Sequence, residues 1–358
     1  MSRFYLFVLI ISLLTLTACN DDDDSGHSSS NVVVVDYDIT TPRIWYKDSI
    51  YLIPSGVDVE AALTIQAGTI IKLYPSQGIA VWDNGVINAV GTSELPIVFT
   101  SIKDDSNGGD NNNDGNATSP NKGDWANVNL YSSNGSVFNY CKFYYGGNKS
   151  YFGALNLGSN TSVVDHCTFA FNDSYISGNE FYGAIYADEA NSSTTITNNT
   201  FYRNVVPMSI DSHISLDNSN QFHNPDDAMQ TNTYNGIFVH TQDINENNVS
   251  WEETEIAFVV TYGSLEIWDP FSLKLGNNVV LKFTSGAGLV LHLQSSLNNH
   301  SGTGVFFTSF KDDNLKGDTN GDGTASTPTN GDWDGIFINA PFDYANWTNI
   351  LYAANYSL

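Results

Sequence analysis

The chain has 358 residues, of which 39 are acidic and 13 are basic, so its formal net charge is −26. This excess of negative charge argues against nucleic acid and anionic lipid surfaces as partners, because both are bound through lysine and arginine. The length is ample for a sizeable core in one or two domains. Asn, Ser, Thr, Gly, Tyr and Phe dominate and no long stretch has helical periodicity, which favours strands and turns.

The N-terminus begins with a signal-like segment. Arg3 precedes an almost unbroken apolar run over residues 4–16, which is short for a membrane-spanning helix and typical of a signal peptide. Residues 16–19, Leu-Thr-Ala-Cys, resemble the lipobox of bacterial lipoproteins. The resemblance implies that residues 1–18 are removed and that the Cys19 thiol carries a lipid, which anchors the protein to a membrane.

An acidic stretch follows the cysteine. Residues 20–24 are Asn-Asp-Asp-Asp-Asp and residues 25–30 are rich in serine, so residues 19–44 are expected to form a solvated tether and lead-in. The acidic run resembles the surface-export signal of Bacteroidetes-type lipoproteins. That resemblance implies an outer-membrane lipoprotein exposed at the cell surface, whereas the simpler alternative is a spacer with no export role.

A long internal repeat divides the rest of the chain. Residues 99–125 and 307–333 align at a constant offset of 208 with 16 of 27 positions identical. Upstream, residues 63–73 match residues 273–283 more loosely. We therefore expect a first copy and a second copy of one architecture.

The copies are assigned to residues 45–256 and 257–358. The second is incomplete and ends without a visible polar cap, which predicts truncation, divergence or capping by another chain.

A shorter period of 26 and 32 residues runs inside the first copy. It repeats two sets of residues, Cys141, Cys167 and Asn199, and Phe143, Phe169 and Phe201. Short alternating strands separated by Asn, Gly and Ser turns cannot bury their apolar side alone, so stacked coils are expected. The pattern resembles the right-handed parallel β-helix family, which includes pectate-lyase-like solenoids.

The predicted fold is therefore all-β, a right-handed parallel β-helix solenoid with two long acidic loop insertions. It predicts an inward phenylalanine stack and a neighbouring inward ladder of Cys141, Cys167 and Asn199. For the two cysteines we favour buried thiols over a disulfide, because side chains of in-register parallel strands have poor disulfide torsions. A pair of β-sandwiches explains the long repeat but leaves the short one unexplained.

The duplicated segments contain the clearest chemical motif. Residues 110–115 and 318–323 both fit D-x-[DN]-x-[DN]-G, in which alternate oxygens and a turning glycine can wrap a hard cation. The resemblance to an EF-hand loop stops there, because the twelfth positions are Asn121 and Thr329 rather than glutamate.

We expect structural Ca²⁺ in each loop. The predicted ligands are Asp110, Asn112, Asp114 and Asp124, and Asp318, Asn320, Asp322 and Asp332. Further carboxylates that can contribute are Asp104, Asp105, Asp312 and Asp313. The alternative is a protruding turn that binds nothing.

No catalytic residue is assigned from the sequence. After the signal segment only Arg43 and Arg203 remain as arginines, and Asp165 and Asp173 are the carboxylates considered for a hydrolase. We therefore expect a surface-anchored, non-catalytic protein for adhesion or glycan binding. The alternative is a polysaccharide lyase or glycoside hydrolase that acts on an extracellular glycan.

Overall fold

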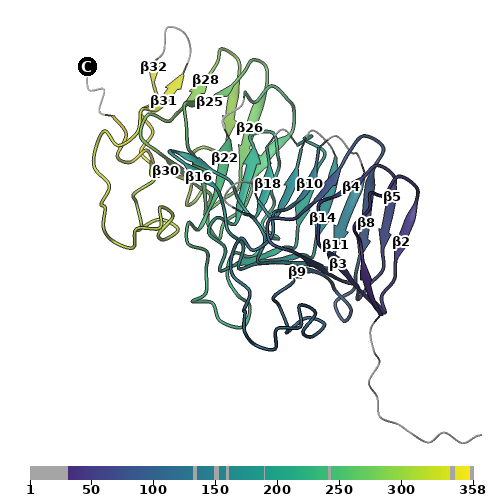
Figure 1. Cartoon of the computed structure of the whole chain (residues 1–358). Coiled ribbons are helices and arrows are strands. Elements are labelled where there is room, and N and C mark those ends of the chain that lie inside the picture. Colours follow the sequence, from purple (N-terminus) through teal and green to yellow (C-terminus); the bar gives the residue numbers. More distant parts are fainter. Residues whose placement is uncertain are drawn as a thin grey trace, which may run out of the picture.

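The computed structural model describes residues 31–131, 135–148, 153–158, 161–188, 190–240, 243–338 and 343–354, and these residues form an all-β protein with large parallel sheets (Figure 1). Within those ranges there is no helix. The signal segment, Cys19 and most of the predicted tether lie outside the described residues.

Three sheets carry the first copy. The seven-stranded sheet has the order β1 (Asn31–Val34), β3 (Ser49–Ile53), β6 (Ile70–Leu73), β9 (Ile97–Ser101), β12 (Cys141–Tyr144), β15 (Thr168–Ala170) and β20 (Thr200–Tyr202). The six-stranded sheet has the order β2 (Arg43–Trp45), β5 (Ala62–Ile65), β8 (Val86–Val90), β11 (Ser136–Asn139), β14 (Ser162–Asp165) and β19 (Thr195–Thr197). The ten-stranded sheet begins with β4 (Val57–Val59), β7 (Ile79–Val81), β10 (Val128–Leu130), β13 (Leu155–Leu157), β18 (Ile185–Ala187) and β21 (Met208–Asp211).

The ten-stranded sheet continues from the end of the first copy into the second copy. Its remaining strands are β22 (Gly236–His240), β24 (Ala257–Val260), β27 (Val280–Phe283) and β30 (Phe306–Ser309). A three-stranded sheet contains β23 (Val249–Trp251), β26 (Ser272–Leu275) and β29 (Ser296–Asn298). A four-stranded sheet contains β25 (Ser264–Ile267), β28 (Gly288–Leu291), β31 (Gly335–Ile338) and the antiparallel β32 (Asp343–Tyr344). A separate antiparallel hairpin pairs β16 (Ile176–Ser177) with β17 (Glu180–Phe181).

The chain visits the sheets in a fixed cycle. In the first copy β5, β6 and β7 lie in the six-, seven- and ten-stranded sheets, and β8, β9 and β10 repeat that order. In the second copy β26, β27 and β28 lie in the three-, ten- and four-stranded sheets. Although β27 corresponds to β6 in sequence, it therefore extends a different sheet. The two duplicated loops consequently leave the stack from different sheets.

The predicted phenylalanine stack is confirmed. Phe143 pairs in register with Phe169, and Phe169 with Phe201, with ring centroids 4.9 and 5.1 Å apart. The stack also extends to Phe99 and Phe222 at 4.7 and 5.2 Å. All five rings are fully buried. Each ring buries apolar area and adds an offset contact with the coils on either side.

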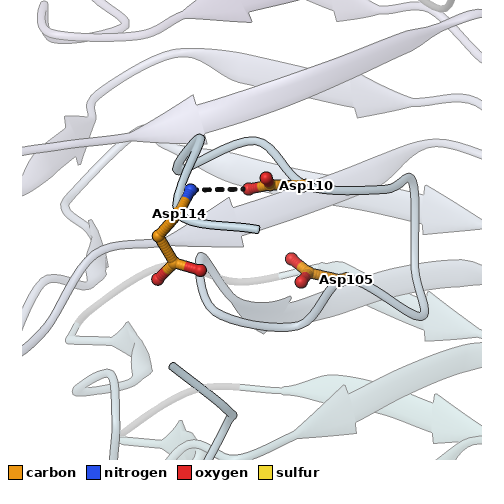
Figure 2. Close-up of side chains that lie close together, drawn as sticks. All are labelled: Asp105, Asp110 and Asp114. Carbon is orange, nitrogen blue, oxygen red and sulfur yellow. Dashed lines mark hydrogen bonds between the residues drawn. The ribbon is translucent and has the colours of Figure 1, made fainter. Parts of the chain in front are cut away.

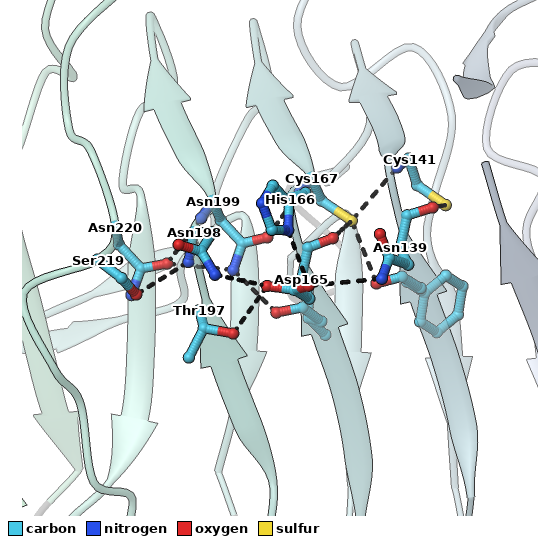
Figure 3. Close-up of polar contacts among 12 residues, drawn as sticks. Asn139, Cys141, Asp165, His166, Cys167, Thr197, Asn198, Asn199, Ser219 and Asn220 are labelled. Carbon is cyan, nitrogen blue, oxygen red and sulfur yellow. Dashed lines mark hydrogen bonds and ion pairs between the residues drawn. The ribbon is translucent and has the colours of Figure 1, made fainter. Parts of the chain in front are cut away.

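The neighbouring ladder is also present (Figure 3). The Cys141 amide lies 3.4 Å from Cys167 Sγ, and the Cys167 amide donates to Asn199 Oδ1 at 2.8 Å. Asn199 continues to Asn220 Oδ1, which accepts its backbone amide at 3.0 Å. Both cysteines are buried and free, and burial raises the pKa of the Cys141 thiol. In this ladder the side-chain oxygen of each asparagine accepts the backbone amide of the residue before it in the ladder, and that amide would otherwise be buried without a partner.

Candidate metal centres in the two acidic loops

The first loop (residues 102–127) joins β9 to β10, and the second loop (residues 310–334) joins β30 to β31. Each covers a lysine on the strand beneath it. Lys72 Nζ donates to the carbonyl oxygens of Asp104 and Gly109 at 2.9 and 2.6 Å. Lys282 Nζ donates to the Gly317 carbonyl at 2.8 Å and to Thr319 Oγ1 at 2.6 Å.

These two lysines are fully buried, which is rare for this residue type. Burial lowers the pKa of Lys72 and lowers that of Lys282 to about 8, although nearby loop aspartates oppose the shift. Each ammonium therefore fixes a positive charge under an acidic loop and holds the loop backbone to the sheet.

Asp124 and Asp332, two of the predicted ligands, close the loops at their base. Asp124 binds Lys103 Nζ at 2.9 Å through Oδ1 and accepts from Ser101 Oγ at 2.8 Å through Oδ2. Asp332 makes the same two bonds in the second loop: it binds Lys311 Nζ through Oδ1 and accepts from Ser309 Oγ through Oδ2, both at 2.8 Å. To act as metal ligands these aspartates would have to give up those bonds.

Asp332 is also held ionised. Burial opposes ionisation, but hydrogen bonds from Lys311, Thr329 and Ser309 outweigh it and lower the pKa of Asp332.

The tip of the first loop brings three aspartates together (Figure 2). One carboxylate oxygen each of Asp105, Asp110 and Asp114 lies within 4.8 Å of the other two. Asp110 also accepts the backbone amides of Asp114 at 3.3 Å and Gly115 at 2.9 Å, which folds the tip. The pKa of Asp114 is lowered, and the largest contribution is the hydrogen bond from the Thr118 side chain. The structure therefore brings Asp110 and Asp114 of the predicted ligand set together with Asp105, one of the further carboxylates considered from the sequence.

Four oxygens in the first loop lack a donor. They are shielded from solvent and belong to Asp105, Asn111, Asn112 and Asp114, in each case Oδ1. The amide of Asn112 meanwhile donates to Asp114 Oδ2 at 2.8 Å, so its own oxygen faces away from that bond. Shielded acceptors without donors are unfavourable, and a hard cation bound by oxygens would satisfy them.

The tip of the second loop has the same hydrogen-bonding pattern as the tip of the first. Asp318 accepts the backbone amides of Gly321 and Gly323 at 2.8 and 2.7 Å, and Asn320 donates to Asp322 Oδ2 at 2.9 Å. A hydrogen bond from Ser326 is the largest contribution lowering the pKa of Asp322. Within the described ranges, only the first loop brings three carboxylates to within 4.8 Å of one another.

Asp313 is the counterpart of Asp105, because it stands 208 residues later. Its Oδ1 is likewise shielded and without a donor. Burial, with the negative charge of Asp318 added, raises the pKa of Asp313. A cation between these carboxylates would remove that repulsion.

Two of the residues considered for catalysis, Asp165 and Arg203, already have hydrogen-bond partners. Asp165 binds His166 Nδ1 at 2.8 Å and accepts from Thr197 and Asn198, both at 2.9 Å (Figure 3). Its pKa is lowered because these hydrogen bonds outweigh burial. Arg203 Nε donates to Gln230 at 2.9 Å, and its guanidinium lies 5.7 Å from the Phe171 ring centre.

The buried lysines are the part of the site that the sequence interpretation missed. A signal was present, because both copies place a lysine inside an otherwise apolar strand of the matched segments. A charge at such a position predicts a covering partner, here the loop backbone.

None of the described residues forms a helix long and apolar enough to cross a membrane. No protein-family model matches this chain, and searches of the curated proteins and of the solved structures find no match.

Proposed function

We propose that this chain is a surface-anchored, non-catalytic lipoprotein for adhesion or glycan binding, built on a right-handed parallel β-helix whose two acidic loops are ordered by Ca²⁺. The lipid on Cys19 would hold it at the outer membrane with its stack facing the exterior. The parallel sheets and their fixed order of visits support the solenoid, and the chain's strong negative charge argues against direct binding to anionic lipid.

One observation carries the calcium proposal. The first loop gathers three carboxylates and four shielded oxygens that lack donors, all on one short segment. Oxygen ligands in a flexible loop suit Ca²⁺ better than Mg²⁺, which demands a tighter octahedron. Because Asp124 and Asp332 already close the loops at their base, the ion would order the tips.

Asp165 and Arg203 already have hydrogen-bond partners within the protein, and this favours a binding role over catalysis. A general base needs a free acceptor, and both carboxylate oxygens of Asp165 already have side-chain hydrogen-bond partners, namely His166, Thr197, Asn198 and Asn139. Polysaccharides incubated with the protein should release no new reducing ends and no unsaturated products. Release of fragments would establish the enzyme alternative.

The calcium proposal is tested by melting the processed chain with CaCl₂, MgCl₂ or EDTA. An ion at a hundred times its Kd stabilises the folded state by about 2.7 kcal/mol. We therefore expect Ca²⁺ to raise the Tm by at least about 2 °C. Sensitised Tb³⁺ luminescence gives a second, direct measurement of binding.

The sharpest variant is Asp105→Asn with Asp313→Asn. In EDTA the double variant should melt at a higher temperature than the wild type, because it removes a repelling charge from each loop tip. In CaCl₂ the order should reverse, because the same charges then bind the ion. Asp243→Asn, at an exposed site elsewhere, should change neither result. Absence of any calcium effect on the wild type would refute the metal sites.

A further inference from the structure

Each copy carries one pair of stacked aromatic rings on its surface. In the first copy Trp82 and Tyr131, which directly follow β7 and β10, have ring centroids 3.9 Å apart and planes 7° apart. In the second copy Trp268 and His292, which directly follow β25 and β28, have centroids 3.8 Å apart and planes 11° apart. Trp82, Tyr131 and Trp268 are 37, 45 and 40% exposed, and His292 is partly exposed. Both pairs therefore present rings to the solvent rather than to the core.

One ring of each pair is bonded to a carboxylate. Trp82 Nε1 donates to Asp58 Oδ1 at 3.1 Å, and His292 Nε2 lies 2.7 Å from Glu266 Oε2. Among the described residues nothing bonds to the second oxygen of either carboxylate, and both acidic residues are partly exposed. Each pair of rings thus has an accessible acceptor beside it.

The two arrangements have the same register. Asp58 pairs with Ala80 across β4 and β7, and Glu266 pairs with Val290 across β25 and β28. In each copy the ring that bonds the carboxylate lies two residues beyond this register partner, on the later strand. β28 also has the place in the second copy that β7 has in the first, because they are the next strands after the matched strands β27 and β6. The arrangement is therefore built twice, although a tryptophan in one copy is replaced by a histidine in the other.

This repetition favours a function at the surface. Exposed rings add little to the core, so core packing gives no reason for both copies to have the same geometry of rings and carboxylate. Figure 1 shows β4 and β10 in one half of the stack and β25 and β28 near its other end, so the two pairs lie far apart. Two separate sites for one class of ligand account for the repetition.

The outer face of the Tyr131 ring is open toward the next coil. Leu130 pairs with Leu157, and the residues that follow them are Tyr131 and Gly158. Glycine has no side chain, so none covers the ring from that position. An exposed ring beside a carboxylate oxygen suits a sugar, whose C–H face packs on the ring while its hydroxyls donate to the oxygen.

We propose that the two ring pairs are two separate binding sites for a neutral saccharide. At each site the sugar ring packs on the exposed aromatic surface, and a hydroxyl donates to the free oxygen of Asp58 or Glu266. Glu60 and Asp269 add an exposed carboxylate to the first and the second site respectively, and these charges repel an acidic sugar. The proposal rests on the glycan-binding part of the proposed function and is independent of calcium.

The first test is affinity gel electrophoresis of the processed chain in gels that each contain one polysaccharide. The neutral probes are mannan, xylan, laminarin and dextran, and alginate and polygalacturonate are their acidic counterparts. We expect at least one neutral polysaccharide to retard the protein and the acidic ones to leave its mobility unchanged. Retardation by the acidic polymers alone, or by none of the six, would overturn the proposal.

Tryptophan fluorescence reports on the two sites directly. Trp82 and Trp268 are the exposed ones among the seven tryptophans, so acrylamide quenches these two most strongly. The retarding polysaccharide should lower the quenching constant, because a bound sugar covers both rings. Spermine, an amine of the kind that rings and carboxylates can also bind, should give no protection. Protection by spermine but by no polysaccharide would identify a cation site and contradict the proposal.

Variants locate the sites. Trp82→Ala and Trp268→Ala should each keep part of the retardation, and the two changes together should weaken binding about tenfold or more. Trp82→Phe with Trp268→Phe should bind nearly as the wild type, because a ring remains at each position. Tyr46→Ala, which removes a 56% exposed tyrosine elsewhere, is the matched control and should bind normally. Complete loss from one single variant with no loss from the other would contradict two sites.

The outcomes separate this proposal from the wider function. If the double alanine variant melts cooperatively and still binds a neutral polysaccharide as the wild type does, the ring pairs are not the sites, although the protein binds glycans. If the wild type binds none of the polysaccharides, the glycan-binding function itself fails. Asp105→Asn with Asp313→Asn should leave the retardation unchanged, because the calcium loops take no part in it.

Discussion

At the residue scale, a buried carboxyl group, that of Glu253, lies beside the point where Lys316 of the second loop bonds to the rest of the protein. Glu253 is fully buried, and its Oε1 accepts the backbone amides of Thr254 and Glu255, both at 2.7 Å, while its Oε2 has no donor. Lys316 of the second loop donates to the Thr254 carbonyl. Burial raises the pKa of Glu253 to about 7. The contact between Lys316 and Thr254 therefore lies next to a carboxyl group, that of Glu253, which ionises near neutral pH.

That ionisation predicts a pH-dependent stability. The folded-state pKa of Glu253 is above its ordinary value of 4.5, so the folded state binds the proton more tightly than the unfolded state. Stability should consequently fall as the pH rises from about 4.5 through 7. Glu253→Gln should remove this dependence and stabilise the protein above pH 7 by at most about 3 kcal/mol.

Urea unfolding between pH 4.5 and 8.5 measures the effect. The free energy of unfolding of the variant should separate from that of the wild type progressively across this range. Glu60→Gln, at an exposed position, serves as the matched control and should follow the wild type. A constant difference at every pH would show that Glu253 does not ionise in this way.

At the element scale, the sequence predicted the strands, the phenylalanine stack and the acidic loops, because each has a local pattern. Strand alternation and the recurrence of Phe143, Phe169 and Phe201 need no knowledge of distant contacts. The corners between strands were less predictable. Tyr140 and His166 adopt positive φ angles of 49° and 52°, a conformation usually left to glycine or asparagine. Packing between coils imposes these angles, and no local signal encodes them.

The site was predictable to a similar degree. Asp110 and Asp114 meet as expected because they lie in one short turn. The pairing of Asp124 with Lys103, and the burial of Lys72 under the loop, depend on how the loop folds back onto β6 and β9. That fold-back is a tertiary feature, so spacing alone could not assign it.

The phenylalanine stack makes a stability prediction for one strand. Phe169 is fully buried between Phe143 and Phe201, whereas Thr168 on the same strand faces outward and is partly exposed. Phe169→Ala should lower the free energy of unfolding by about 3–5 kcal/mol, because it leaves a cavity and breaks two ring contacts. Thr168→Ala should cost less than about 1 kcal/mol. Equal losses in urea unfolding would contradict an inward stack.

At the scale of the whole molecule, the 208-residue repeat does not return to the same sheet. The ten-stranded sheet ends the first copy with β21 and β22 and takes up β24, β27 and β30 of the second copy, so that β27 lies in a different sheet from its counterpart β6. The first loop therefore leaves the seven-stranded sheet and the second leaves the ten-stranded sheet. Ions in both loops, if bound as proposed, would therefore brace two different sheets.

The proposed membrane anchor makes the last prediction, which concerns where the whole molecule resides. Strand β1 begins at Asn31, about a dozen residues after Cys19 in the sequence. Two acyl chains on one cysteine give stable membrane attachment, since each buried CH₂ contributes about 0.8 kcal/mol. In a lipoprotein-exporting bacterium the wild type should sediment with membranes and be digested by protease added to intact cells.

Cys19→Ser should release the protein into the soluble fraction, because the modified thiol is then lost. Replacing Asp21, Asp22, Asp23 and Asp24 by alanine should leave the protein in the membrane but protected from external protease, which separates the anchor from the export signal. Protease digestion of this second variant to the wild-type extent would show that the acidic run is a spacer. Membrane retention of Cys19→Ser equal to that of the wild type would remove the lipid anchor from the proposal.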